Sequence, residues 1–424
     1  MTVLKNYKRW LIVCSISLLL TFCFHSLISQ KIEFVSYSNG KLRIQDYAYH
    51  IIITRAFWFD SFGDIYKLTF QQQALSVYVG TSIYNVMPIG ITPIALVVWF
   101  PFAYVAGFSM ALSYTLWVTF SIGILSTALW RVRRYVIQVK KLELLPITLS
   151  LVTIFSATTF FAIIHGQTSV LAAGLLIYLI YFVHKTAESF KTDSWLPILF
   201  IIFLLGIKPT YLALGLSLLI IYGRWRETLY SIFTVFVLLM GITPMLTLKW
   251  VPSYLNLLQM YSHGNFSEFY AWAIVPKTMN IFRSAFGKII GNNLAGLVST
   301  IVNCCIFIGV IGYSIFVKIR ENLRDQFFPI RITKEQALIL LAACYLLFAP
   351  YAGAYEDVLF LPVFSTVLLV GKTPDLTNYK SLVLIFALCI ILFQSCFPPD
   401  KPLWLFWILK ALIFGYVLNF FRAV

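Results

Sequence analysis

Long apolar runs separated by short polar stretches dominate the pattern of the chain. Runs of about 20 residues match a hydrocarbon core of ~30 Å, and such lipid-embedded runs form helices so that every backbone polar group is paired. The pattern therefore predicts an all-α polytopic membrane protein, one domain over residues 1–424, with about 11–13 transmembrane helices. The predicted helices cover 10–29, 88–108, 110–130, 144–164, 168–184, 195–207, 209–222, 228–248, 291–317, 335–350, 357–371, 380–397 and 403–421.

Two polar stretches, 30–87 and 249–290, are too long to be simple connections. Loops of this length are usually functional, and we expect both to be extracytoplasmic. The aromatic and apolar segment 47–59 suits a helix at the membrane interface. Near residue 200 the predicted helices are short, and Gly206 and Pro209 either break one long segment or mark a tight outer hairpin.

Composition agrees with a membrane location. The 424 residues are 60% hydrophobic and 11% charged, whereas a soluble domain carries roughly 25% charged residues. The net charge of +16 would suggest nucleic acid as a partner of a soluble protein. Here the basic residues form short clusters between apolar runs, as cytoplasmic loops do, so no nucleic-acid partner is expected.

The basic clusters also orient the chain. If they all face the cytoplasm, the connections near 165–167, 208, 249–290, 351–356 and 398–402 face outward. The N-terminal third does not fit, because two full crossings between 88 and 130 would place the cluster at 131–141 outside. Either one of those segments is re-entrant, or part of 30–87 dips into the membrane, or this cluster is an exception.

The termini and the cysteines suggest no further chemistry. The apolar run after Lys5, Lys8 and Arg9 is long and lacks a clean small-x-small site, so we interpret it as the first membrane helix rather than a cleaved signal. The seven cysteines lie in or beside apolar runs without zinc-ligand spacing, and we interpret them as small core residues. Asp46 and His50 could share a helical face but are too few to form a metal site.

Polar residues at the predicted outer edges are the candidates for chemistry. The first long loop holds Asp46, Asp60 and Asp64 among aromatic residues, and a carboxylate is what general-base catalysis on a hydroxyl requires. Further along, Lys208 sits at a helix end, where a lysine either extends to the interface or holds a phosphate. Taken singly, each of these residues is as well explained as a solvated loop residue or a helix cap. Together they place acids, an amide and a cation on one side of the bundle.

Several ordered motifs resemble glycosyltransferase family 87, in the GT-C class, over roughly residues 44–372. The motifs are Asp46-Tyr47-Ala48-Tyr49-His50, Gly63-Asp64-Ile65-Tyr66, Gly166-Gln167-Thr168-Ser169, Gly206-Ile207-Lys208-Pro209, Gly223-Arg224-Trp225-Arg226 and Tyr355-Glu356-Asp357. The chain departs from the family pattern at Ile91-Thr92-Pro93, where Tyr-Pro-Pro is usual, and has no histidine in the last motif.

The resemblance implies a GT-C-type bundle whose enzyme takes a hexosyl group, with mannosyl expected, from a polyprenyl-phosphate-sugar donor. The acceptor would be a lipid or a glycan on the extracytoplasmic face, and the anomeric centre would be inverted. Asp46 would be the general base. The expected substrate-binding residues are His50, Asp64, Tyr66, His165, Gln167, Lys208, Tyr355, Glu356 and Asp357, and the second long loop adds Lys277, Arg283 and Lys288 as phosphate contacts.

The resemblance also implies that no cofactor or metal is needed, because a nearby cation can stabilise the phosphate leaving group. Besides donor and acceptor, the expected partners are membrane lipids, and the expected location is multi-pass in the cell membrane, in bacteria the plasma membrane. Two alternatives stay open: a lipid or glycan transporter or flippase without transferase activity, and a related GT-C enzyme with a different sugar or a polymer acceptor. Transporters commonly contain internal repeats, and we find none in this sequence.

Overall fold

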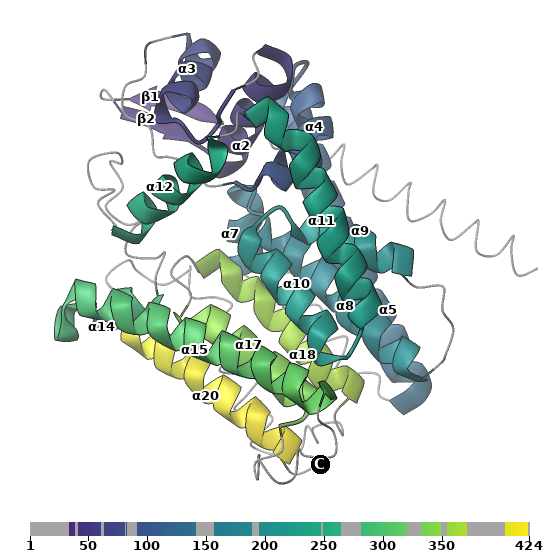
Figure 1. Ribbon diagram of the computed structural model, residues 1–424. Coiled ribbons are helices and arrows are strands. Elements are labelled where there is room, and N and C mark those ends of the chain that lie inside the picture. The colour runs from purple at the N-terminus through teal and green to yellow at the C-terminus, as the bar shows by residue number, and fades with distance from the viewer. Residues whose placement is uncertain are drawn as a thin grey trace, which may run out of the picture.

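The structure, a computed structural model, describes residues 34–38, 41–60, 63–80, 82, 91–140, 157–188, 195–246, 249–263, 281–319, 332–348, 354–370 and 403–422. The predicted helices 10–29 and 380–397, and part of 144–164, lie outside these residues. Apart from one short hairpin, the described elements are helices, which confirms the all-α class (Figure 1).

The observed helices lie close to the apolar runs that predict them. They are α4 (Pro93–Ala106), α5 (Met110–Lys140), α7 (Ala157–Ile164), α8 (Ser169–Glu188), α9 (Trp195–Leu205), α10 (Pro209–Ile221), α11 (Trp225–Leu246), α15 (Asn292–Ile319), α17 (Lys334–Phe348), α18 (Phe360–Val370) and α20 (Leu403–Arg422). A 3-10 helix, η3 (Ala354–Leu359), precedes α18. The second long loop contains α12 (Trp250–His263) and α14 (Ile281–Ile290).

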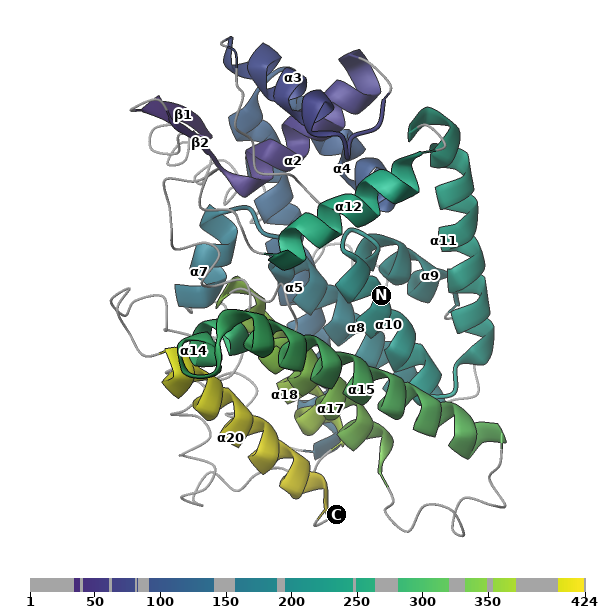
Figure 2. The same ribbon diagram turned by 60° about the vertical axis from the view of Figure 1, so that its left-hand side comes forward.

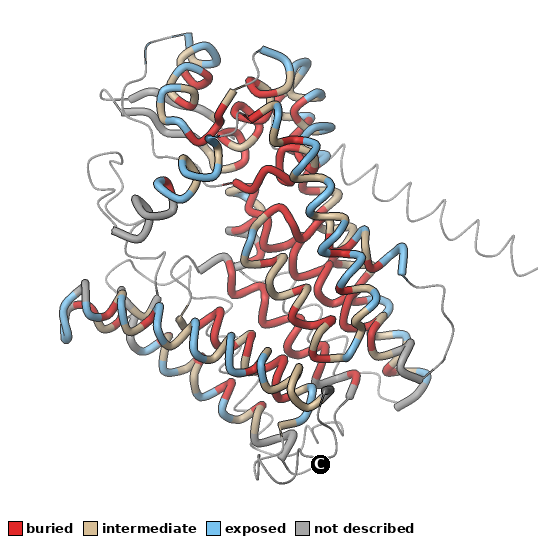
Figure 3. The backbone as a smooth tube through the Cα atoms, in the orientation of Figure 1, coloured by how far each residue is buried: buried red, intermediate tan, exposed pale blue. Residues whose placement is uncertain are grey.

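Three of the described helices are long and apolar enough to cross a membrane: Met110–Gln138 within α5, Trp225–Leu246 and Leu294–Val317. Large apolar side chains project outward from two of them, for example Phe233 on α11 and Ile308 on α15. Figure 3 shows the buried residues gathered among α5, α8, α10 and α18, while α11 and α15 have many exposed positions. This distribution fits lipid-facing helices around a buried core.

The lengths of α4 and α5 bear on the orientation of the N-terminal third. The 14 residues of α4 rise about 21 Å, short of a ~30 Å hydrocarbon core. The 31 residues of α5 rise about 46 Å and carry Arg131, Arg133 and Arg134 near the far end. A spanning α5 after an α4 that does not span would place this basic cluster on the cytoplasmic side, as the re-entrant alternative predicts.

The first long loop is more structured than its sequence suggests. Strands β1 (Val35–Ser38) and β2 (Lys41–Ile44) pair antiparallel, with Val35 opposite Ile44. Helix α2 (Asp46–Arg55) continues into a π-helical turn, η1 (Ala56–Asp60), and α3 (Leu68–Val79) follows. The hairpin was not expected from the apolar pattern, because four-residue strands leave little periodic signal.

Helix α2 forms where an interfacial helix was predicted, but it is packed inside the protein. Three consecutive residues, Ile51, Ile52 and Ile53, are all buried, so its apolar side chains cover more than one face. It contacts α3, α4 and α5. In Figure 2, α2, α3 and α4 gather at one end of the bundle with α12 beside them. The burial of α2 fixes its first residue, Asp46, against the bundle.

The segment near residue 200 is a hairpin rather than one broken helix. Helices α9 and α10 are joined by Gly206, Ile207 and Lys208 and pack against each other. Gly215 of α10 lies against Ile202 and Leu205 of α9, where an added Cβ would come within 3 Å of their side chains. The hairpin presents Lys208 at its turn, immediately before Pro209, which starts α10.

Candidate active site

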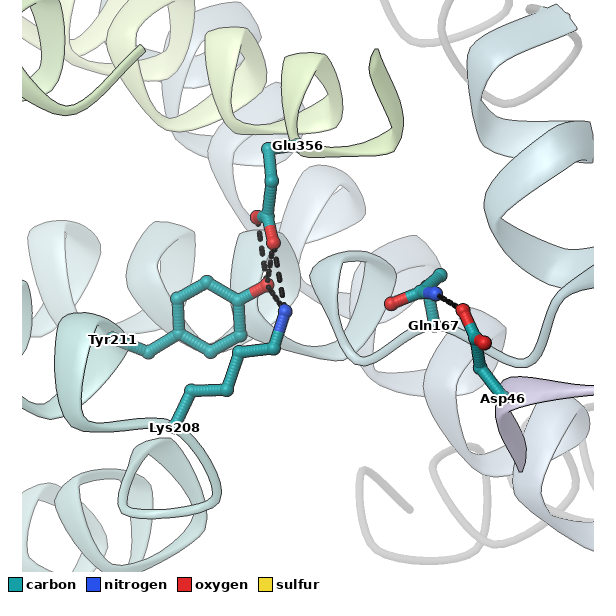
Figure 4. Close-up of polar contacts among 5 residues, drawn as sticks. All are labelled: Asp46, Gln167, Lys208, Tyr211 and Glu356. Carbon is teal, nitrogen blue, oxygen red and sulfur yellow. Dashed lines mark hydrogen bonds and ion pairs between the residues drawn. The ribbon is translucent and has the colours of Figure 1, made fainter. Parts of the chain in front are cut away.

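Asp46 and Gln167 form the first part of the candidate site. Asp46 lies in the first turn of α2, where a carboxylate is favoured by the helix dipole. Gln167 lies just before α8 and is largely buried. Its Nε2 donates a hydrogen bond to Asp46 Oδ2 (Figure 4). The structure thus brings together two predicted site residues from distant parts of the sequence.

The turn between α7 and α8 makes this contact possible. Gly166 has a φ of 63°, which L side chains rarely adopt, and an added Cβ would lie 2.3 Å from Tyr47 Cβ. The Tyr47 N–H donates to the His165 carbonyl at 3.3 Å. The Gln45 side chain donates to the Ile164 carbonyl. These contacts hold the start of α2 directly against the turn that carries Gln167.

Lys208, Tyr211 and Glu356 form the second part. Lys208 Nζ lies 2.9 Å from Glu356 Oε1, and the Tyr211 hydroxyl donates to both carboxylate oxygens at 2.7 Å. Glu356 and Tyr211 are fully buried, whereas the Lys208 side chain keeps 27% of its surface exposed. In Figure 4, Gln167 lies between this cluster and Asp46. The cluster holds a partly accessible ammonium group whose charge acts on the Asp46 carboxylate.

Electrostatics link the two parts. Burial raises the pKa of Asp46, while the charges of His165 and Lys208 and the Gln167 hydrogen bond oppose the rise. Burial lowers the pKa of His165, and the Asp46 charge partly offsets this. A buried carboxylate with a raised pKa is a stronger base than a solvated one. Asp46 thus has the environment expected of a general base.

His50 lies one helical turn after Asp46. Its ring stacks on Trp99, with ring centroids 5.7 Å apart and an interplanar angle of 7°. Burial, with a smaller contribution from Lys208, lowers its pKa to about 3, so His50 is neutral near pH 7. Its buried Nδ1 has no hydrogen-bond partner among the described residues. A neutral imidazole nitrogen of this kind can accept a hydrogen bond from a substrate hydroxyl.

The observed contacts of Asp64 and Tyr66 are with residues outside the Asp46–Gln167 and Lys208–Tyr211–Glu356 groups. Ser253 of α12 donates to Asp64 Oδ2 at 2.6 Å, and the Tyr66 backbone N–H donates to Asp64 Oδ1 at 3.1 Å. The Tyr66 hydroxyl donates to the Ile91 carbonyl, and its ring packs on Tyr254 at 4.9 Å. These two residues join the first long loop to the second. Their predicted role in substrate binding stays a prediction.

Of the remaining predicted residues, one forms a second ion pair, and the side chains of the others lie outside the described residues. Asp357 is fully buried and lies 2.5 Å from Lys410 Nζ. The side chains of Tyr355, Arg283 and Lys288, and Lys277 as a whole, lie outside the described residues. Sequence reasoning missed Tyr211 and Lys410. The available signals were the spacing of Tyr211, three residues after Lys208, and the position of Lys410 as a cation inside an apolar run.

The arrangement offers a candidate base and a cation in one partly buried region. Among the residues that the structure describes, no group of three or more His, Cys, Asp or Glu side chains could hold a metal ion. The chemistry available from the described side chains is proton removal at Asp46 and compensation of negative charge at Lys208. Both are the functions needed to join a hydroxyl nucleophile to a carbon bearing an anionic leaving group.

Comparison with known proteins identifies the family. The model of "Glycosyltransferase family 87" matches residues 92–329, more than half of the chain. The match includes Gln167, Lys208 and Tyr211, whereas Asp46 and Glu356 lie outside it. Curated proteins and solved structures gave no match. The chain therefore belongs to glycosyltransferase family 87 and is a membrane glycosyltransferase.

Proposed function

We propose that the enzyme transfers a hexosyl group, specifically mannosyl, from a polyprenyl-phosphate-sugar donor to a hydroxyl of a lipid or glycan acceptor. The reaction takes place on the extracytoplasmic face of the cell membrane. It inverts the anomeric centre and uses no metal or other cofactor. The observation that carries the proposal is the hydrogen bond of Gln167 to Asp46, a carboxylate on which the charge of Lys208 also acts.

In the proposed reaction, the acceptor oxygen attacks the anomeric carbon from the face opposite the phosphate. The new glycosidic C–O bond forms as the bond from that carbon to the phosphate oxygen breaks. The acceptor proton passes to the Asp46 carboxylate, and the bond electrons leave with polyprenyl phosphate. Lys208 compensates the added negative charge, as a preorganised cation does in a buried site.

The other residues have supporting roles in this proposal. Gln167 orients the Asp46 carboxylate through its N–H group and can present its amide oxygen to a sugar hydroxyl. His50 accepts, at Nδ1, a hydrogen bond from a hydroxyl of the sugar donor or of the acceptor substrate. Glu356 is the counter-ion that holds the Lys208 ammonium in place before the donor phosphate arrives. The donor phosphate would then bind Lys208 together with Glu356, or it would displace Glu356 from Lys208.

The direct test uses the purified full-length enzyme in lipid nanodiscs with a radiolabelled polyprenyl-phosphate mannose and an extract of membrane lipids and glycans. Transfer of label to an acceptor supports the proposal, and the configuration of the new bond reports on inversion. Transfer from a nucleotide sugar but not from the lipid-linked donor would overturn the donor assignment. Movement of the donor between liposome leaflets without covalent transfer would instead support the transporter alternative.

A further inference from the structure

Two adjacent acids in η3 face different parts of the protein. Glu356 points to α10, where it pairs with Lys208 and Tyr211. The next residue, Asp357, points to α20, where it pairs with Lys410 at 2.5 Å. The side chains of Glu356, Asp357 and Lys410 are all fully buried. Successive residues of a 3-10 helix point about 120° apart, so one rigid turn connects the site to the C-terminal helix.

Helix α20 is also attached by contacts other than the ion pair. Phe414 stacks on Phe360 of α18 with ring centroids 5.1 Å apart. Trp407 donates to the Leu347 carbonyl at 3.1 Å and packs on Phe348 at 5.7 Å. Replacing a buried ion pair by apolar side chains is often neutral or stabilising. A buried charge in an apolar helix therefore points to a functional role, and residues of this kind in membrane helices usually have one.

The role of the pair follows from what lies next to Asp357. Fixing Asp357 fixes the backbone of η3 and, with it, the direction of the Glu356 side chain. Glu356 in turn accepts from both Lys208 and Tyr211. We infer that Lys410 is a positioning residue: through Asp357 it holds Glu356 against Lys208 and so sets where the ammonium group of the site is held.

This inference rests on the proposed function in one respect: the phosphate-binding role of Lys208 comes from that proposal. Lys410 and Glu356 both lie beyond the matched residues 92–329, so the C-terminal part of the chain would complete a site built mainly from the matched part. The inference can be tested without donor, acceptor or turnover. Failure of that test and failure of the transferase assay are therefore separate results.

The experiment measures how fast Lys208 is acylated by a small, membrane-permeable N-hydroxysuccinimide ester in the full-length protein in nanodiscs, read by peptide mass spectrometry. Lys208 is partly exposed, and the exposed Lys249 serves as an internal reference. Three variants are compared with the wild type. Lys410→Met removes the cation of the ion pair, and Asp357→Asn with Lys410→Met gives a neutral pair. Glu356→Gln gives the benchmark rate for a Lys208 that has lost its counter-ion. Trp407→Phe is the matched control, because it removes a polar contact of α20 and leaves the ion pair.

We expect Lys410→Met and the neutral pair to raise Lys208 acylation several-fold, toward the Glu356→Gln rate, with Lys249 unchanged. Adding Lys410→Met to Glu356→Gln should give no further increase. If Lys410→Met fails to fold, the neutral pair, which leaves no unpaired charge, decides the question. Wild-type acylation in a folded neutral pair would overturn the inference. So would an equal increase in Trp407→Phe, which would indicate general loosening of α20.

Discussion

The amide of Gln167 donates a hydrogen bond to the carboxylate of Asp46, a residue 121 positions earlier in the chain. The bond joins the matched family region to the first long loop that precedes it. It depends on the Gly166 turn, which allows α2 to approach the start of α8. It also favours the ionised form of Asp46, against the burial that raises its pKa.

Replacing Asp46 by Asn should remove most of the transferase activity. The amide keeps the shape of the side chain but cannot accept a proton, and general-base catalysis contributes about 10²–10⁴-fold. Initial rates with a polyprenyl-phosphate-sugar would measure the loss. Asp60→Asn is the matched control, because Asp60 is exposed at the end of η1 in the same loop. Near-wild-type turnover in a folded Asp46→Asn enzyme would remove Asp46 from the mechanism.

The pH profile should show an acid limb that belongs to Asp46. The base acts only when deprotonated, so kcat/KM falls as the pH drops through its pKa. Because burial raises this pKa, the limb should lie above pH 3.8, the ordinary value for Asp. His50, with a pKa of about 3, should not contribute. A profile flat from pH 7 down to pH 4 would contradict this assignment.

Gln167→Ala should move the same limb to higher pH. The Gln167 hydrogen bond stabilises the ionised carboxylate, so its loss raises the pKa of Asp46 further. The rate at neutral pH should also fall, because the Asp46 carboxylate loses the contact that orients it toward the acceptor hydroxyl. Gln73→Ala, at an exposed position of α3, is the control and should leave both the limb and the rate unchanged. A lower rate with an unmoved limb would mean that Gln167 acts on the substrate alone.

Lys208→Met should both weaken binding of the donor and slow the transfer, because Lys208 is proposed to bind the donor phosphate and to compensate the charge that develops on it. Losing a hydrogen bond to a charged group costs about 1.5–3 kcal/mol, so KM for the donor should rise about 10- to 100-fold. Lys208→Arg should recover part of the affinity, since it retains the charge but changes its geometry. Lys249→Met tests for a general charge effect, as Lys249 is exposed at the start of the second loop. An unchanged donor KM in Lys208→Met would exclude the phosphate role.

Gly166→Ala should destabilise the protein more than Gly80→Ala. Both glycines have positive φ, 63° and 75°, and a left-handed L residue costs about 1–2 kcal/mol. At Gly80 a Cβ would meet nothing within 4 Å, whereas at Gly166 it would collide with Tyr47. Overpacking adds about 1–3 kcal/mol. Thermal unfolding in detergent, together with activity, would compare the two variants; equal shifts in Tm would refute the steric argument.

The helices could be predicted from the sequence because apolar runs and helix boundaries coincide. Pro209 starts α10 and the Gly206 region ends α9, as their backbone preferences require. The β1–β2 hairpin could not be predicted from such runs, and the packing of α2 inside the bundle was obscured by its aromatic composition, which also suits an interface. In both cases tertiary contacts decide the outcome.

The candidate site could be predicted only in part, for a related reason. Asp46, Gln167 and Lys208 stand out as polar residues at the ends of apolar runs. Their mutual positions depend on turns such as that at Gly166, whose conformation the sequence does not specify. The partners of Glu356 and Asp357 come from α10 and α20, and pairing over such separations has no local signal.

In the proposed reaction, the turn of the α9–α10 hairpin would set how deep in the membrane the sugar is transferred. In the orientation predicted from the basic clusters, the 13 residues of helix α10 rise about 20 Å from the cytoplasmic end, where Arg224 follows. A hydrocarbon core of ~30 Å extends farther than this, so in that orientation Lys208 would lie below the outer headgroup layer. A donor whose phosphate descends to Lys208 would leave bulk water before it reacts. This depth would protect the sugar from hydrolysis, and an acceptor would have to bring its hydroxyl down to the same level.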